Sequence, residues 1–251
     1  MRIIHISDVH IGDADADLLE AAVAAIAARA PDVVALSGDV TQSGRAREFS
    51  AAAQFLRRLP APVVATPGNH DAPVFHPLLR MIDPYGRFKA LPASPTWDAP
   101  DATGAVRQVA TARAIQTRRD WSQGAYDLTT LRDALSAPPG WLFLVAHHPP
   151  GTFPGARVRS DARRAADARA LVGARPRTVI LAGHAHGFCL ERFGAAGCAL
   201  IVAPSLASRR PRAGGHGFVE IDAGSAGLAA ILHTFDGAGF GPALRAELAA
   251  A

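Results

Sequence analysis

Side chains that can bind metal ions recur at five places in this sequence, each directly after a short apolar run. They are Asp8 with His10, Asp39, Asn69 with His70, His147, and His184 with His186. Carboxylate and amide oxygens mixed with imidazole suit divalent zinc, manganese, iron or cobalt. Because no cysteine takes part, a structural zinc finger is disfavoured. The sequence therefore predicts a divalent metal site built from several separate segments.

Each of these motifs has an ordinary alternative when it is taken alone. Asp39 follows Gly38 and could simply cap a turn. The Gly-His-Ala-His segment is the most specific, because alternate residues of an extended chain project to the same side, so His184 and His186 can reach one site together. What favours the metal site is the joint occurrence of all five motifs, in order, each after an apolar segment.

The apolar segments have the lengths and spacing of buried strands alternating with helices. Strands are expected at residues 2–6, 33–36, 63–65, 141–146 and 178–182, and helices at 15–30, 46–58 and 162–172. This order is typical of a parallel sheet covered by helices. In such sheets ligands bind at the carboxyl ends of the strands, where the five motifs lie.

The remaining segments are less regular. Residues 72–140 contain many prolines and are expected to form an irregular insertion, a possible cap, with a short helix, strand pieces near 106–116 and a helix near 127–136. Residues 188–235 alternate apolar runs with glycine-bearing turns and predict antiparallel strands. We expect one domain over 1–235 and a C-terminal tail, 236–251, that forms a frayed helix.

The composition narrows the class of protein. The chain has 251 residues, 49% of them hydrophobic, which fits one large domain with a substantial core. No stretch of 18 apolar residues predicts a membrane span, and the first apolar run is too short for a secretory leader, so we expect a soluble cytoplasmic protein. Its net charge of +4 comes from dispersed arginines, and its two cysteines, Cys189 and Cys198, are expected to be reduced.

The motif series resembles that of the calcineurin-like metallophosphoesterase superfamily. The residues that carry the resemblance are Asp8-x-His10, Gly38-Asp39, Gly68-Asn69-His70-Asp71, His147 and Gly183-His184-x-His186. Within the superfamily, Gly38-Asp39-Val40-Thr41 and His147-His148-Pro149-Pro150 are similar to bacterial cyclic-nucleotide phosphodiesterases and glycerophosphodiesterases. The resemblance implies an α/β fold, a four-layer α/β/β/α sandwich.

The resemblance also implies two adjacent divalent metal ions, drawn from manganese, iron, zinc or cobalt. One would be bound by Asp8, His10 and His186, the other by Asn69, His147 and His184, with Asp39 bridging both. Two cations about 3.5–4 Å apart can hold and acidify a water between them, and the resulting hydroxide attacks phosphorus in line with the leaving group.

Two further residues receive catalytic roles from the resemblance. His70 would lie over the substrate phosphate as a charge stabiliser or proton donor to the leaving group. Asp71 would orient His70, although it could equally cap the following turn. His148 has two possible roles, to support the metal site or simply to pack beside it. For His216 the alternatives are packing and contact with substrate.

Several functions remain open at this point. The leading expectation is hydrolysis of a small-molecule phosphodiester, a cyclic nucleotide or a glycerophosphodiester. Alternatives are a phosphomonoesterase, a nucleotide-lipid pyrophosphatase, and, from other classes, a nuclease or nucleic-acid-binding module or a metal-free scaffold. Nucleic acid is disfavoured because no basic stripe is interleaved with aromatic residues, which make up only 6% of the chain. A scaffold is disfavoured because every position of the motif series is present.

Overall fold

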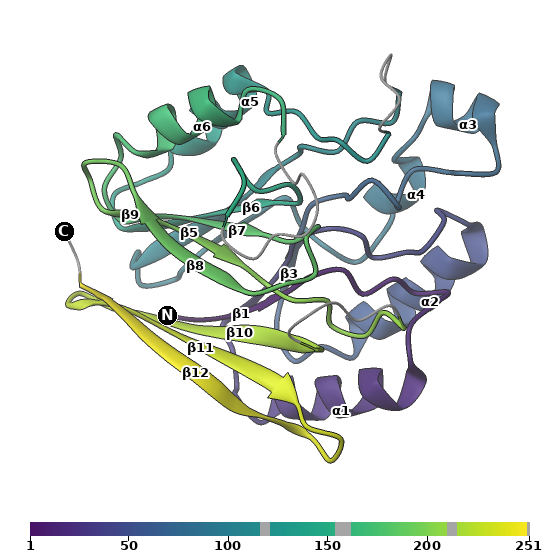
Figure 1. Cartoon of the computed structure of the whole chain (residues 1–251), viewed down its shortest axis with the longest axis horizontal. Helices are drawn as coiled ribbons and strands as arrows, with labels where there is room; N and C mark the ends of the chain where they lie inside the picture. The colour runs from purple at the N-terminus through teal and green to yellow at the C-terminus, as the bar shows by residue number, and fades with distance from the viewer. Residues whose placement is uncertain (116–120, 154–161, 210–214, 250–251) are drawn as a thin grey trace.

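Two six-stranded sheets stacked face to face form the centre of the molecule (Figure 1). The structure is a computed structural model that describes residues 1–115, 121–153, 162–209 and 215–249. Each sheet contains a run of parallel strands, and the loops at the carboxyl ends of these strands carry the five motifs.

The first sheet combines the N-terminal and C-terminal parts of the chain. Its strands, in spatial order, are β12 (Phe240–Ala249), β11 (Gly227–Phe235), β10 (Gly217–Ala223), β1 (Arg2–Ile6), β2 (Val33–Leu36) and β3 (Val63–Ala65). Strands β1, β2 and β3 are parallel, while β10, β11 and β12 continue the sheet in antiparallel fashion from the other edge of β1. Apart from partly exposed Arg2, all residues of β1, β2 and β3 are buried, as their continuous apolar sequences predict.

The second sheet is built from the middle of the chain. Its order is β4 (Thr96–Asp98), β5 (Gly104–Val109), β6 (Trp141–Ala146), β7 (Thr178–Ala182), β9 (Cys198–Val202) and β8 (Cys189–Phe193). Strands β5, β6, β7 and β9 are parallel, and the two edge strands run antiparallel to their neighbours. Cys189 and Cys198, on the β8–β9 hairpin, are both free thiols.

Three apolar clusters hold the layers together. The first joins the facing sides of the two sheets and includes Val33, Val64, Phe143 and Val179. The second packs the outer face of the first sheet against helices α1 (Ala16–Ala27) and α2 (Ala46–Arg57). The third packs the outer face of the second sheet against helices α5 (Leu128–Leu135) and α6 (Ala165–Val172). The expected α/β/β/α sandwich is therefore confirmed.

The C-terminal segment differs from the expectation of a frayed helix over 236–251. Residues 240–249 form strand β12, which pairs with β11 along its whole length, from Gly227↔Ala249 to Phe235↔Phe240. Alanine and glycine content led to the wrong element because the pairing partner, β11, supplies the hydrogen bonds that the local sequence does not reveal.

The segment 72–140 contains more regular structure than an irregular insertion. It holds the short helices α3 (Pro77–Ile82) and α4 (Gly86–Lys89), the strands β4 and β5, and helix α5. Helices α3 and α4 lie beside the carboxyl ends of the strands, at the upper right of Figure 1. Among the described residues, no helix has both the length and the apolar character required to cross a bilayer.

Candidate metal centre

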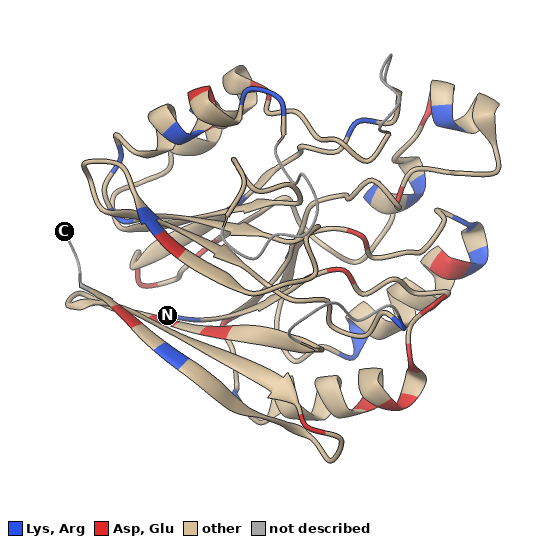
Figure 2. Ribbon diagram, viewed as in Figure 1, with Lys and Arg blue, Asp and Glu red and all other residues tan. Residues whose placement is uncertain are grey.

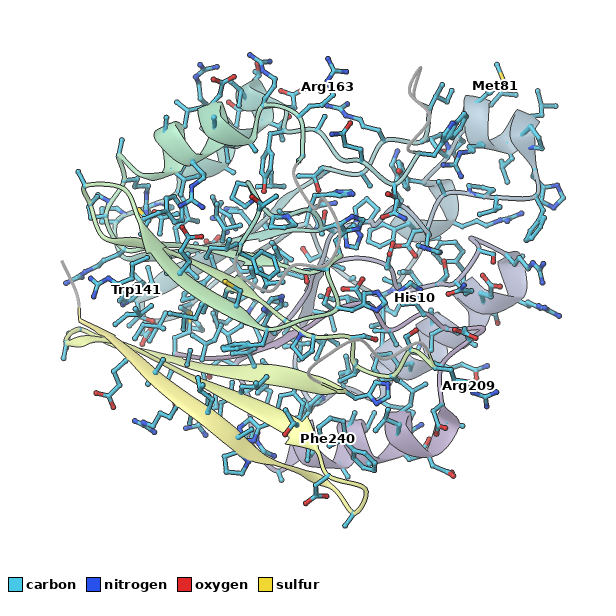
Figure 3. All side chains as sticks on the ribbon, in the orientation of Figure 1. His10, Met81, Trp141, Arg163, Arg209 and Phe240 are labelled. Carbon is cyan, nitrogen blue, oxygen red and sulfur yellow. The ribbon has the colours of Figure 1, made fainter. Side chains whose placement is uncertain are left out.

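The five motifs meet where the carboxyl ends of the parallel strands of both sheets converge. Asp8 and His10 follow β1, Asp39 follows β2, and Asn69 follows β3. His147 follows β6 of the second sheet, and the His184–His186 segment follows β7. Figure 3 shows His10 at this junction, where the loops of the two sheets approach one another. Residues as far apart in the chain as Asp8 and His186 thereby come into contact.

Many of these residues adopt a backbone conformation that L-amino acids disfavour. Positive φ angles between 50° and 67° occur at Asp8, His10, Asp39, His184 and His186. Such angles are uncommon outside glycine and tend to occur at functional sites. The extended conformation expected for His184 and His186 is therefore wrong. Because both residues have a left-handed backbone conformation, the segment turns. The imidazole of His184 therefore lies with His147, and that of His186 with Asp8 and His10.

Two glycines allow these loops to approach closely. A Cβ atom on Gly38, whose φ is +87°, would lie 2.6 Å from Nδ1 of His147. A Cβ atom on Gly68 would lie 2.1 Å from Oδ1 of Asp39. Both distances are shorter than any real Cβ contact, so only glycine fits at either position without displacing a residue of the candidate site.

One group of potential ligands consists of Asp8, His10 and His186, all buried. Nε2 of His186 lies 3.1 Å from Oδ1 of Asp8 and 3.2 Å from Nε2 of His10. The other carboxylate oxygen of Asp8 accepts hydrogen bonds from Ser7 Oγ, at 2.5 Å, and from the backbone N–H of His184, at 2.9 Å. Oδ2 therefore fixes the carboxylate, while Oδ1 faces the histidines. Burial would raise the pKa of Asp8, but the neighbouring His186 holds it below its usual range.

The second group centres on His147. Its Nδ1 donates a hydrogen bond to the carbonyl of Ser37 at 2.8 Å, which orients the ring. Its Nε2 lies 3.1 Å from Oδ1 of Asn69, and the ring centroids of His147 and His184 are 5.1 Å apart. Burial and the charge of His147 lower the pKa of His184 to about 4, which leaves that imidazole neutral and able to bind a metal.

Asp39 lies between the two groups. Its Oδ2 is 3.9 Å from Nε2 of His10 and 3.4 Å from Nε2 of His147. Its Oδ1 accepts the backbone N–H of His70 at 2.8 Å. Burial would raise the pKa of Asp39, but His147 holds it well below its usual range. A buried carboxylate that stays ionised between two imidazole groups has the position that a bridging ligand requires.

The contacts of His147 show that these residues fit a cation. With Nδ1 donating to Ser37, the neutral ring would bring an Nε2 lone pair against Asn69 Oδ1 and Asp39 Oδ2, two further acceptors. A positive charge at Nε2 resolves this conflict. Accordingly, although burial alone would lower the pKa of His147, Asp39 raises it to about 9. A divalent ion can replace that proton among the same donor atoms.

His70 stands at the edge of the same site and is partly exposed. Its Nδ1 lies 2.7 Å from the carbonyl oxygen of Gln42, to which it can donate. A ring nitrogen of His70 lies within 4.8 Å of ligand atoms of His10 and Asp39. His70 therefore reaches the site while its orientation is set by the backbone of the preceding ligand loop.

Asp71 does not orient His70, contrary to the expectation from the sequence. Its buried carboxylate accepts hydrogen bonds from the backbone N–H groups of Val40, Thr41 and Gly68 and from Thr41 Oγ1. Burial and the charge of Asp39 raise the pKa of Asp71 to about 6 despite these bonds. Asp71 thus joins the loop after β2 to the loop after β3, and no hydrogen bond connects it with the imidazole of His70 among the described contacts.

His148 lies against the second group, with its ring centroid 4.5 Å from that of His184. Both of its ring nitrogens are within hydrogen-bonding distance of protein groups, Nδ1 of Thr111 Oγ1 at 2.9 Å and Nε2 of the Ser122 carbonyl at 2.7 Å. Burial lowers its pKa well below the usual value, so Nε2–H donates and Nδ1 accepts. His148 therefore anchors the segment around Ser122 beside the site. His216 has its Nε2 2.7 Å from the Ser208 carbonyl.

The sequence did not single out the groups that orient the ligands. Ser37 places its carbonyl against His147 and its Oγ against Nε2 of the buried His5, and Ser7 fixes Asp8. The only sequence signal is a serine directly after a buried strand and close before a carboxylate, as in Ser7-Asp8 and Ser37-Gly38-Asp39.

A cavity of about 610 Å³ opens beside the site. Asn69 and His70 form part of its wall. The rest comes from α3, from the segment before it and from the segment around Trp121: Val74, Pro77, Arg80, Met81, Ile115, Trp121 and Ser122. Because it adjoins the candidate ligands and has a wall of mostly apolar side chains, it has the character of a small-molecule binding site.

Comparison with known proteins identifies the family to which the chain belongs. A family model described as calcineurin-like phosphoesterase matches residues 1–188, the span that contains all five motifs. This match confirms the resemblance drawn from the sequence. A search of curated proteins finds no match.

Solved structures share the fold at low sequence identity. A dimetal phosphatase from Danio rerio is 13% identical, with a TM-score of 0.72, and covers 100% of this chain and 99% of its own. A purple acid phosphatase from yellow lupin seeds is 14% identical, with a TM-score of 0.62, over 98% of this chain and 53% of its own. A Vps29 variant from Entamoeba histolytica is 11% identical, with a TM-score of 0.53, over 99% of both chains.

Proposed function

Because the chain belongs to the calcineurin-like phosphoesterase family, we propose that it hydrolyses small-molecule phosphodiesters. At the coarser level it is a dinuclear metal-dependent hydrolase of phosphate esters, with two divalent ions as its cofactor. The proposal adds the substrate class and the assignment of residues to the two ions.

We assign the two groups of donor atoms to two ions. Asp8, His10 and His186 would hold one, Asn69, His147 and His184 the other, and Asp39 would belong to both. Support comes from the convergence of these donor atoms and from the position of Asp39 Oδ2 between His10 and His147. When bound, the two ions supply an acidified water as nucleophile and neutralise the oxygens of the phosphoryl group.

The chain's own residues position the substrate and move a proton. His70 has Nδ1–H against the Gln42 carbonyl, so when the ring is protonated on both nitrogens its Nε2–H can give a proton to the departing oxygen and leave the neutral ring. The Ser37 carbonyl and Ser7 Oγ hold His147 and Asp8 in their orientations, so the ligands need little rearrangement when ions bind.

The observation that carries the diester assignment is the apolar cavity next to His70. A monoester bears nearly two negative charges and one organic arm, whereas a diester bears one charge and two arms. A monoester site should therefore add fixed positive charge beyond the metals. Instead, the wall beside Asn69 and His70 is mainly apolar, with room for a second arm.

Among the described residues of the cavity wall the one arginine is Arg80, and backbone carbonyls hold its guanidinium. Its Nε donates to the carbonyl of Ala114 at 2.6 Å, and its Nη1 lies 3.4 Å from the carbonyl of Ala72. Arg164 lies 3.5 Å from Asp167 at the start of α6, and Figure 3 shows Arg163 beside that helix, away from His10. Arg157 and Arg159, also in the arginine-rich loop, lie outside the described residues.

Side-by-side kinetics on bis-nitrophenyl phosphate and nitrophenyl phosphate test the proposal. For the metal-reconstituted enzyme, we expect kcat/KM, divided by the uncatalysed rate, to be higher for the diester. A preference for the monoester that disappears when Arg157 and Arg159 are replaced by glutamine would overturn the diester assignment and leave the metal chemistry in place.

A further inference from the structure

Helix α3 has the reverse of the usual distribution of side chains. Leu78, Met81 and Ile82 are 71%, 67% and 74% exposed. Arg80, in contrast, turns inward, where Nε donates to the Ala114 carbonyl and Nη1 lies within hydrogen-bonding distance of the Ala72 carbonyl. A surface helix normally buries its apolar face and exposes its charges. Figure 2 shows this helix with a single blue turn on an otherwise uncharged ribbon.

The exposed apolar surface extends beyond the helix. Val74 and Phe75 precede it, and Ile115 and Trp121 face it from another segment, with exposed fractions of 49%, 59%, 54% and 48%. Large apolar side chains gathered in this way on a soluble fold mark a binding surface more often than chance exposure. The surface is continuous with the cavity, because Val74, Met81, Ile115 and Trp121 are both exposed and part of the cavity wall.

Two polar residues of the cavity wall adjoin the metal centre. Asn69 and His70 belong to the candidate metal centre. Among the described residues of the remaining wall, polar groups belong to Arg80, Trp121 and Ser122, while Val74, Pro77, Met81 and Ile115 are wholly apolar. Arg80 is held by backbone carbonyls, and the Ser122 carbonyl faces His148. A polar ligand such as a nucleobase needs partners for its donors and acceptors when it leaves water. This wall is better suited to an aliphatic group.

The cavity is also held in shape before any ligand binds. Arg80 connects α3 to residues 72 and 114, and its guanidinium carbon lies 5.2 Å from the ring centroid of Trp121. His148 anchors Ser122 from the opposite side. A preformed wall requires little ordering when a ligand enters, so burial of apolar surface contributes more fully to affinity.

We propose that this cavity binds an aliphatic arm of the substrate, so that the preferred substrates are amphiphilic phosphodiesters. The phosphate lies at the metal centre beside His70, and the apolar chain lies against Met81 and Ile115 within the cavity. This inference rests on the proposed phosphodiesterase function and adds the chemistry of one arm. A single bound molecule explains the observations better than a membrane surface or a second copy of the chain, because the apolar side chains lead into the cavity rather than forming only an outer patch.

A series of alkyl nitrophenyl phosphates tests this inference, because the leaving group stays constant while the alkyl arm grows from methyl to octyl. Below the aggregation concentration of each ester, we expect kcat/KM to rise by about fourfold for each methylene buried, until the cavity is filled. Met81→Gln, which makes the cavity wall polar, should flatten this rise. Ile82→Gln is the matched control, since Ile82 is equally exposed on the same helix but is not part of the cavity wall.

Calorimetric titration with methyl octyl phosphate and dimethyl phosphate gives a readout that does not need turnover. If the octyl ester binds at least tenfold more tightly than dimethyl phosphate, the cavity binds an aliphatic arm. If this is found but no diester is hydrolysed, the inference holds and only the proposed function fails. Hydrolysis and binding that are both independent of chain length overturn the inference and leave the diesterase intact. The inference is also overturned if chain length matters only above the aggregation concentration and if Ile82→Gln abolishes the effect as fully as Met81→Gln. That result would indicate binding to a lipid surface.

Discussion

His10 Nε2 and His186 Nε2 lie 3.2 Å apart, although the two residues are 176 positions apart in the chain. Both are buried, and Oδ1 of Asp8 lies 3.1 Å from the second. When both rings carry their proton on Nδ1, the two Nε2 lone pairs and Oδ1 of Asp8 face one another, and a cation between them stabilises the arrangement. Burial lowers the pKa of His10, so this ring is neutral at neutral pH and can bind a metal ion.

Removal of the metals should therefore destabilise the fold. A ligand that binds only the folded protein at a thousand times its dissociation constant stabilises it by about 4 kcal/mol. For a chain of this size, that corresponds to a change in Tm of roughly 8–16 °C. Differential scanning calorimetry with and without a chelator checks this, and an unchanged Tm would contradict a metal site that links both sheets.

Metal affinity should depend on pH through His147. In the metal-free protein its pKa is raised to about 9, mainly by Asp39, whereas that of His184 is lowered to about 4. At pH 7 a divalent ion must then displace one proton from His147 and none from His184. We expect the association constant of the ion at this site to rise by about tenfold per pH unit up to roughly pH 9.

Calorimetric titration of the chelated protein in buffers with different ionisation enthalpies measures this proton directly. About one proton released per ion at the His147 site is the expected value at pH 7. Proton uptake, or no transfer at all, would show that His147 is not the titrating ligand.

His70→Ala should separate catalysis from metal binding. Because His70 lies at the edge of the site with Nδ1 against Gln42, its loss should leave the metal content unchanged and lower kcat by roughly a hundredfold, the usual scale for a general acid. The decrease should be smaller for nitrophenolate, which leaves without a proton. His76→Ala, an exposed histidine before α3, is the matched control. Equal losses for good and poor leaving groups would leave His70 with a charge-stabilising role alone.

Asp71→Asn should act on stability more than on chemistry. An asparagine side chain has only one carbonyl oxygen, so it cannot accept from Gly68, Val40 and Thr41 as the carboxylate does. We expect the free energy of unfolding to fall by about 1–3 kcal/mol. Urea unfolding measures this change, with Asp83→Asn at an exposed position as control. A loss of turnover as large as that of His70→Ala, without loss of stability, would restore the catalytic role expected from the sequence.

The sequence was a good guide to the elements that deliver the candidate ligands. Each strand that precedes a motif is short, apolar and buried, as at residues 33–36 and 141–146, so local pattern and tertiary environment agree. Strand β12 was mistaken for a helix because its stability comes from pairing with β11. Local pattern does not contain that partner.

The contacts within the site were less accessible from the sequence. Adjacency in the chain favoured a pairing of Asp71 with His70, but the carboxylate instead turns toward the loop after β2. The cavity beside α3 depends on Arg80 reaching the Ala114 carbonyl, 34 positions away. Such long-range contacts follow from packing, and no periodicity in the sequence encodes them.

Anomalous scattering from crystals of metal-reconstituted protein tests the central claim most directly, because it locates the ions without relying on a substrate. Two peaks are expected, one bound by Asp8, His10 and His186, the other by Asn69, His147 and His184, with Asp39 in contact with both. In Asp39→Asn crystals, both peaks should weaken together. Absence of any peak at this junction, or a single peak that Asp39→Asn leaves unchanged, would contradict a dinuclear centre bridged by Asp39.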